Sequence, residues 1–494
     1  MKNTTAMADY ELRHIEALRK DLAGCTVLLK KDGSFPLEKP CTLAAYGSGV
    51  RRTIRGGTGS GEVNSRYIVT IEEGLQQAGF TLTGMEWHTG YEQAREKAHK
   101  AFLKQLKKDA KAAKQSFILY GMGKVMPEPE YDLPLNAEGD AAIYVVSRIS
   151  GEGNDRTPLK GDIRLTDSEV RDILALDKKF TRFMLVLNVG GVVDLSPVMS
   201  VRNILLLSQL GVETGGALAD ILLGKANPSG KLTTTWAAFE EYPEMPDFED
   251  MNETRYREGI YVGYRYFETF GDAAKRVCYP FGFGLSYTQF SLAVQSVTET
   301  EQAIRAFVLV TNTGDYSGKE VVQMYYSAPQ GLLQKPAREL SAFCKTRTLL
   351  PGESQLLTLE TAKDSMASYD DLGKIFKSSY ILEKGDYHFY IGTSVRDVIA
   401  LDYVMTLNAN LLVEQLSSKA APASLKKRLL ADGSYEELPQ GTANDPNACV
   451  FEKMVPGTEE ALAPATRGRA SYLLLNSYKE NAHPLIDVYE GKIS

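Results

Sequence analysis

Short apolar runs alternate with amphipathic stretches over the first 290 residues of the chain. The apolar runs predict strands at 42–46, 116–120, 141–146, 183–189 and 203–208, and the amphipathic stretches predict helices at 67–78, 92–114, 166–180 and 214–223. Strands that alternate with helices pair mainly in parallel, and helices cover both faces of their sheet. Thr166 is a candidate N-cap for the third helix, with Ser168 and Glu169 after it.

The pattern changes after residue 290. Strand-like runs recur there at short spacing, with turn sequences between them and no stretch of helical period: the runs are 306–311, 321–326, 356–359 and 387–391, and the turns are 312–315 and 350–353. This spacing predicts a β-sandwich of the immunoglobulin or fibronectin type. Such a module is more often structural than catalytic.

The chain therefore divides into three predicted parts. Residues 1–290 form an α/β sandwich domain and residues 291–407 a β-sandwich, so the fold class is α/β plus β. Residues 408–494 form a linker or extension, in which we expect a helix within 411–430, a loop over 432–448 and a strand at 471–475.

Composition narrows the range of partners. The net charge is −7 and the isoelectric point about 5.6, which argues against nucleic acid and anionic membranes. The five cysteines are scattered without metal-site spacing, so we expect no structural metal and a reducing compartment. The sequence contains no leader-like apolar segment and no run of about 18 apolar residues. A cytoplasmic protein is the simplest expectation.

A glycine-rich stretch covers residues 55–66. Its spacing matches neither GxxxxGK[ST] nor GxGxxG at a strand–helix turn, so nucleotide binding is disfavoured and no cofactor is expected. The favoured interpretation is a loop whose backbone closely approaches a ligand or a neighbouring domain, and a purely structural loop remains the alternative. The candidate residues of this loop are Gly57, Thr58, Gly59, Ser60, Gly61 and Glu62.

A single glutamate, Glu152, stands between two glycines just after the apolar run 141–146. A carboxylate on a glycine-flanked loop at the carboxyl end of a strand is well placed to meet a ligand. It can act there as a general acid/base on a glycosidic oxygen. Asp155 and Arg156 follow closely and are candidates to face the same substrate or partner. A surface glutamate in a flexible turn is the alternative.

Other chemistry has less support. Aromatic and glycine residues alternate over 256–267 and 279–287. They are either a platform for sugars or, more commonly, packing residues where two domains join. The sequence has no HExxH and no GxSxG, so metalloprotease and Ser/His/Asp mechanisms have no local support.

Several motifs occur in a specific order between residues 20 and 405. They lie at 26–30, 32–37, 56–61, 150–153 with 155–156, 187–190, 224–232, 261–266, 281–287, 312–314, 318–321 and 350–353. In this order the chain resembles glycoside hydrolase family 3, in its β-glucosidase/β-xylosidase branch. Each motif is weak alone, but their joint order is specific.

This resemblance implies an α/β sandwich followed by a fibronectin type III-like domain, a β-linked glucoside or oligosaccharide as substrate, and Glu152 as the general acid/base. The nucleophile of this family is an aspartate on a separate (β/α)₈ barrel, typically within Ser-Asp-Trp. That motif is absent here, since the two tryptophans are Trp87 and Trp236. We therefore expect the non-barrel part of a member with reversed domain order, in which residues 408–494 lead toward an absent barrel.

A retaining mechanism needs two carboxyl groups about 5 Å apart, and this chain is expected to supply one. We therefore expect little activity from the chain alone and interpret it as half of a split or truncated β-glucosidase, completed by a separate (β/α)₈ barrel polypeptide. The alternative is a non-catalytic carbohydrate-binding or scaffold protein derived from such an enzyme. A homo-oligomer is compatible with either.

Overall fold

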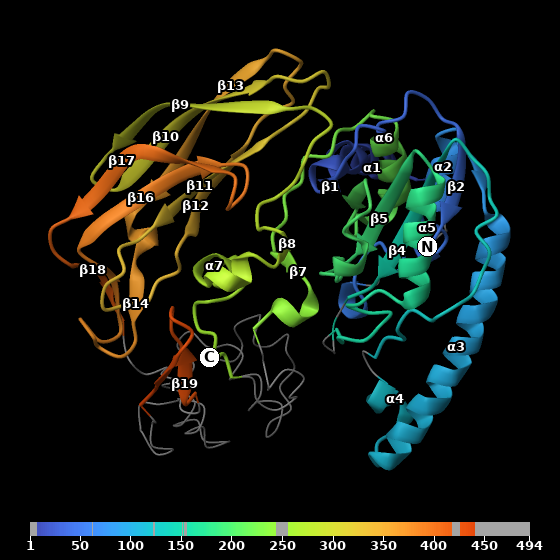
Figure 1. Ribbon diagram of the computed structural model, residues 1–494, viewed down its shortest axis with the longest axis horizontal. Coiled ribbons are helices and arrows are strands. Elements are labelled where there is room, and N and C mark those ends of the chain that lie inside the picture. Colours follow the sequence, from blue (N-terminus) through green and yellow to red (C-terminus); the bar gives the residue numbers. More distant parts are fainter. Residues whose placement is uncertain are drawn as a thin grey trace.

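The structure is a computed structural model. It describes residues 7–61, 63–121, 124–150, 152, 156–243, 255–416 and 425–439. Two lobes lie side by side, one built on a sheet covered by helices and the other on β-strands alone (Figure 1). This confirms the predicted α/β plus β fold class. No helix among the described residues has the length and apolar character of a membrane span.

The first lobe contains a six-stranded sheet in the order β1-β6-β5-β4-β2-β3. The strands are β1 (Val27–Lys30), β2 (Thr42–Tyr46), β3 (Thr81–Thr83), β4 (Ala141–Arg148), β5 (Phe183–Val189) and β6 (Ile204–Leu206). All neighbours pair in parallel except β1, which runs antiparallel to β6 at one edge. The predicted mostly parallel sheet is therefore confirmed.

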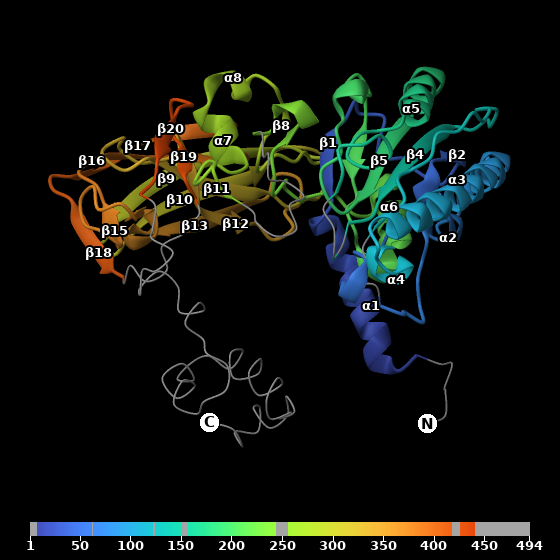
Figure 2. The ribbon, with the colours of Figure 1, turned by 90° about the horizontal axis from the view of Figure 1, so that it is seen from below.

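Helices cover both faces of this sheet. They are α1 (Asp9–Asp21), α2 (Ile71–Gln77), α3 (Met85–Ala112), α5 (Asp167–Lys179) and α6 (Thr214–Leu222). Alternate residues of β4 enter different cores: Tyr144 packs with residues of α3 and α5, and Val145 packs with residues of α2 and α6. Figure 2 shows α5 on one side of the strands and α1 on the other. Burial on both faces explains why the central strands are continuously apolar.

The chain leaves two neighbouring strands in opposite directions. From β2 it passes through α2 to β3, toward one edge of the sheet. From β4 it passes through α5 to β5, toward the other edge. The carboxyl ends of β2 and β4 therefore form a topological switch point, where connecting loops diverge and leave room for a ligand. The N-cap of α5 is as predicted, because the Thr166 side chain accepts a hydrogen bond from the Glu169 amide.

The strand predicted at 116–120 is wrong. Residues Phe117–Gly121 form a short helix, α4, that packs against α3 outside the sheet. Ile118 is 76% exposed and Leu119 67% exposed, so this apolar run has no core to enter. Periodicity alone does not separate a strand from a helix in a run of five apolar residues.

The second lobe is the predicted β-sandwich. Its two main sheets have the orders β13-β10-β9 and β12-β11-β16-β17, and a small third sheet is β14-β15-β18. The strands are β9 (Phe290–Glu299), β10 (Ala303–Asn312), β11 (Val321–Ser327), β12 (Glu339–Lys345), β13 (Ser354–Ala362), β14 (Ser368–Asp370), β15 (Ser379–Leu382), β16 (Gly385–Gly392), β17 (Val398–Leu407) and β18 (Leu411–Gln415).

The helix expected within 411–430 is not present in the described part of that range. Residues 411–415 form β18, which pairs with β15, and Lys427–Leu429 form β19, which pairs with β20 (Tyr435–Glu437). Pairing with strands already in place decides the conformation here. The strand expected at 471–475 lies outside the described residues.

The aromatic stretches pack where the lobes join. The elements at this junction are β7 (Trp236–Ala237), α7 (Tyr264–Thr269), α8 (Gly271–Ala274) and β8 (Val277–Tyr279). Tyr261 and Phe267 are fully buried. Ion pairs cross the junction, among them Lys231 with Glu320 at 2.7 Å. The described aromatic residues thus favour packing over a sugar platform, although Tyr256 is 66% exposed.

A close helix crossing gives the first prediction. A Cβ atom at Gly74 of α2 would overlap the backbone of Gly215 in α6. We expect Gly74→Ala to lower the free energy of unfolding by about 3 kcal/mol, because backbone cannot rotate away from an added methyl group. Urea denaturation measures this. The control is Gly271→Ala, where no atom of the part of the chain that the structure describes lies within 4 Å of the added Cβ. Equal, small effects of the two substitutions would contradict the close crossing.

A buried histidine gives the second prediction. His88 of α3 is 1% exposed, and its Nε2 lies 3.0 Å from the Ala45 carbonyl oxygen. Burial lowers the pKa of His88 to about 4, whereas the unfolded chain has a value near 6.5. The unfolded state therefore binds more protons between these values. The resulting stabilisation is fully present above pH 6.5 and is lost as the pH falls toward 4.

We expect the stability advantage of the unchanged chain over His88→Gln to shrink by about 3 kcal/mol between pH 7 and pH 4. Urea denaturation at each pH measures the difference between the free energies of unfolding of the two chains. Other titrating groups contribute equally to both chains, so their contributions cancel in this difference. A difference that does not vary with pH would contradict burial of the neutral imidazole.

Candidate active site

Two loops meet at the switch point between β2 and β4. The loop after β2 carries the glycine-rich stretch, and the loop after β4 carries Glu152. The Glu152 amide donates to the Thr58 carbonyl oxygen at 3.4 Å. Gly59 has φ +78°, and a Cβ atom on it would lie 2.6 Å from Glu152 Oε2 and 2.7 Å from Glu152 Cβ. Only glycine fits at this point of contact.

The Glu152 side chain is exposed to solvent. Among the described residues, no atom lies within 4 Å of the place where a side chain on Gly61 would begin. The carboxyl group of Glu152 therefore lies on an exposed rim of the lobe, with the glycine-rich backbone beside it.

Asn188, near the end of β5, fixes the start of the glycine-rich loop. Its Oδ1 accepts from the Ile54 amide at 2.6 Å, and its Nδ2 donates to the carbonyl oxygens of Ile54 and Ser208, both at 2.7 Å. The side chain is fully buried. One amide group thus connects the loop after β2, the end of β5 and the loop after β6. Ser147 adds a hydrogen bond to the Arg52 carbonyl oxygen at 3.2 Å.

Arg156 anchors the far end of the Glu152 loop. Its Nε donates to Asp162 Oδ1 at 2.7 Å, and its Nη1 donates to the Val192 carbonyl oxygen at 2.7 Å. A Cβ atom at Gly191 would lie 3.2 Å from Nη1. Its Nη2 is buried and has no hydrogen-bond partner among the described residues. Arg156 is therefore mainly a structural support of the loop, with one donor left over.

A buried charge cluster lies under the rim. Arg148, the last residue of β4, donates through Nη2 to Glu169 Oε2 at 2.6 Å, and both side chains are buried. Tyr91 of α3 hydrogen-bonds the carboxyl group of Glu128. Burial raises the pKa of Glu128, although the positive charge of Arg148 opposes this. The strand end that leads to Glu152 is thus held by paired groups rather than by apolar contacts alone.

The structure brings together most of the residues predicted for the site. Gly57, Thr58, Gly59 and Gly61 lie on the loop beside Glu152, and Arg156 lies at its base. Glu62, Asp155 and the side chain of Ser60 lie outside the described residues. Asn188 and Ser147 were not among the predicted site residues. The signal for Asn188 was available, because it is the one polar residue in the apolar run 183–189.

Comparison with known proteins identifies the family of the chain. The model of the glycosyl hydrolase family 3 C-terminal domain matches residues 26–287, which is more than half of the chain. The chain belongs to glycosyl hydrolase family 3. A fibronectin type III-like domain matches residues 320–395, within the second lobe.

The family 3 chain is similar to curated β-glucosidases. It is 41% identical over 485 residues to β-glucosidase A of Butyrivibrio fibrisolvens. The matched region covers 89% of this chain and 57% of the relative. It is 34% identical over 430 residues to a β-glucosidase of Ruminococcus albus, covering 84% of this chain and 43% of the relative. The family 3 chain thus spans about half the length of these relatives.

Solved structures of β-glucosidases have the same fold. The enzyme of Paenibacillus barengoltzii is 36% identical with a TM-score of 0.75, covering 90% of this chain and 50% of that chain. β-Glucosidase 3B of Thermotoga neapolitana, solved with α-D-glucose, is 33% identical with a TM-score of 0.68, covering 83% and 56%.

The rim of this family 3 chain carries one carboxyl group, that of Glu152, beside the backbone of a glycine-rich loop whose start is fixed by Asn188. Among the described residues, no group of three histidine, cysteine or acidic side chains is arranged to hold a metal ion.

The role of Asn188 gives the third prediction. Asn188→Ala would leave the Ile54 amide and two carbonyl oxygens without their partner, so we expect a loss of about 3 kcal/mol in the free energy of unfolding. Urea denaturation measures the loss. Asn410→Ala is the control, because Asn410 accepts one exposed hydrogen bond from the Lys384 amide and its removal should cost below about 1 kcal/mol. Equal losses in the two variants would contradict the anchoring role.

Proposed function

We propose that this chain acts in the hydrolysis of β-linked glucosides with retention of configuration, and that Glu152 is the general acid/base. The observation that supports the proposal is the contact of the Glu152 loop with the glycine-rich loop at the carboxyl edge of the sheet, through Gly59. The similarity to β-glucosidases over most of the chain supports β-linked glucosides as the substrate class.

In this proposal Glu152 first protonates the glycosidic oxygen as the aglycone leaves. The ionised carboxylate then takes a proton from the water that releases the sugar. The attacking group is an aspartate on a (β/α)₈ barrel, which must place its carboxylate about 5 Å from that of Glu152. The residues of the glycine-rich loop face the substrate or the barrel next to Glu152.

The chain itself is proposed to supply only the acid/base half of the site. General acid catalysis contributes roughly 10²- to 10⁴-fold, well below the 10⁶-fold or more that is typical of enzymes. We therefore expect the 494-residue chain to hydrolyse aryl β-glucosides poorly when alone. Activity should appear once a nucleophile-bearing family 3 barrel is present, either in a longer polypeptide or as a separate one.

The test of the proposed function is to mix the purified chain with a family 3 (β/α)₈ barrel and measure kcat/KM. For glucosides with poor leaving groups, Glu152→Gln should lower kcat/KM by roughly 10²- to 10⁴-fold. For 4-nitrophenyl glucoside the first step should fall much less, because its leaving group needs little protonation. Azide should accelerate turnover of Glu152→Gly, because it releases the sugar in place of water and, unlike water, needs no base. The product should be β-glucosyl azide.

The matched control is Glu138→Gln, since Glu138 lies in the segment before β4, at the opposite edge of the sheet, with its side chain 85% exposed. Its kcat/KM should equal that of the unchanged chain. Hydrolysis by the chain alone that is lost on Glu152→Gln would contradict the need for a barrel. Glucoside binding without hydrolysis in any mixture would favour a non-catalytic carbohydrate-binding protein instead.

A further inference from the structure

Helix α3 projects beyond the edge of the sheet that carries Glu152. Its first turns lie against the carboxyl end of β2, where the rings of Trp87 and Tyr46 are 6.0 Å apart. Ala94 is the last residue of α3 that packs on the core of the first lobe. The 18 remaining residues extend roughly 27 Å further. Figure 1 shows α3 running past the end of the sheet, with α4 at its far end.

We name residues 95–121 and 124–126 the arm. Leu106 is buried in the arm, close to Gly121 after the chain has turned back. A hollow of about 480 Å³ opens between α3 and the returning segment, lined by Arg95, His99, Phe102, Leu103, Ile118 and Val125 among others. Ile118 and Leu119 are 76% and 67% exposed. Isolated apolar side chains on a surface are common, but adjacent ones beside a hollow mark an interaction site.

The arm is strongly basic. Residues 95–124 contain nine lysine and arginine residues against two acidic residues, a net charge of +7 in a chain whose net charge is −7. Lysine ammonium groups lie over two aromatic rings of the arm: Lys107 Nζ is 5.6 Å from the centre of the Phe117 ring, and Lys124 Nζ is 3.8 Å from that of Tyr120. A partner surface that complements the arm is acidic and carries apolar side chains that enter the hollow.

The arm is continuous with the candidate site. At its base Glu92 pairs with Arg52 of the loop after β2 at 3.5 Å. Exposed apolar side chains also occur in the chain after each of the two loops: Val63 is 61% exposed and Leu159 is 57% exposed. The base of the arm is thus tied to the same loop whose Gly59 contacts Glu152.

We propose that the arm is a docking surface for the nucleophile-bearing barrel that completes the site, and that it binds an acidic, partly apolar face of that barrel. The inference rests on the proposed function. A domain placed over Glu152 must lie beside the arm, and the curated relatives contain about as much chain again as the part matched here. The charge of the arm steers this acidic face toward the rim, and its hollow fixes the position.

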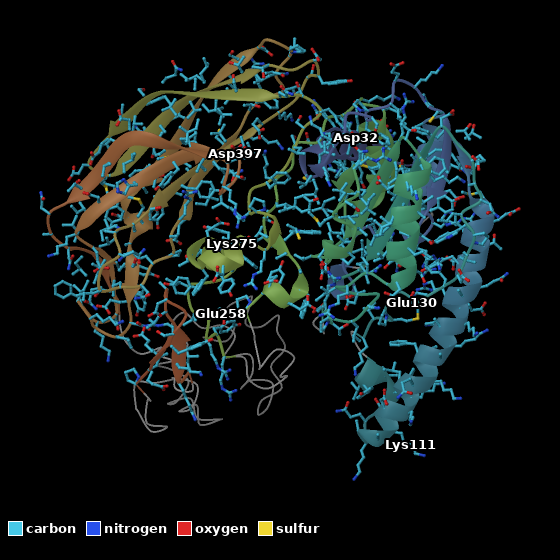
Figure 3. All side chains as sticks on the ribbon, in the orientation of Figure 1. Asp32, Lys111, Glu130, Glu258, Lys275 and Asp397 are labelled. Carbon is cyan, nitrogen blue, oxygen red and sulfur yellow. The ribbon has the colours of Figure 1, made fainter. Side chains whose placement is uncertain are left out.

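The experiment measures binding of a fluorescently labelled family 3 (β/α)₈ barrel to the full chain by anisotropy. We expect Ile118→Asp with Leu119→Asp to weaken binding at least tenfold. Lys111→Glu, at the far end of the arm, should weaken binding several-fold at 50 mM salt and less at 500 mM, where charges are screened. Lys275→Glu, at the residue that follows α8, is the control and should bind as the unchanged chain does, because Lys275 lies well away from Lys111 (Figure 3).

The outcomes separate the two proposals. If all variants bind the barrel equally and hydrolysis depends on Glu152, the arm is not the docking surface while the proposed function stands. If the arm variants lose binding but the unchanged mixture shows no Glu152-dependent hydrolysis, the docking surface stands and the proposed function fails. Dimers of the chain alone that dissociate in the Ile118/Leu119 variant, or binding to phosphatidylserine vesicles instead of the barrel, would overturn the assigned partner.

Discussion

The parallel pairing of β2 with β4 is the constraint on which the candidate site depends. Leu43 pairs with Ala141 and Tyr46 with Tyr144, so the carboxyl ends of both strands lie on the same side of the sheet. Because the chain continues from β2 toward one outer strand of the sheet and from β4 toward the other, their loops diverge at these carboxyl ends. The glycine-rich loop and Glu152 are brought together by this pairing, although they are some ninety residues apart in the sequence.

The site combines a rigid base with an open top. Asn188 and the buried pair of Arg148 with Glu169 fix the strand ends, whereas Glu152 stays exposed. The electrostatic interactions of a charged or proton-transferring group become stronger once water is excluded from its surroundings. As the proposed acid/base, the exposed Glu152 carboxyl group is placed for a covering partner, and the basic arm extends from the same side of the sheet. In this account, association and catalysis are coupled through one edge of the sheet.

The sequence predicted those elements whose pattern is set by burial. The strands at 42–46 and 183–189 were predicted with the observed bounds, because both of their faces are buried. Residues 116–120 were misread as a strand, because an apolar run on an exposed arm looks like one in a core. Glu152 was found from its glycine flanks, but its contact with Gly59 depends on strand order, which local periodicity does not encode. Asn188 stands out as the one polar residue of its apolar run, but its anchoring role depends on Ile54 and Ser208, which are distant in the sequence.

The central claim is that Glu152 is one of two carboxyl groups of a retaining site formed with a barrel. It is tested most directly by a crystal structure of the chain bound to a nucleophile-bearing family 3 barrel. The account predicts a separation of about 5 to 5.5 Å between the carboxyl group of Glu152 and that of the barrel aspartate. A bound barrel that leaves the two groups more than about 10 Å apart, or that covers another face of the lobe, would contradict it.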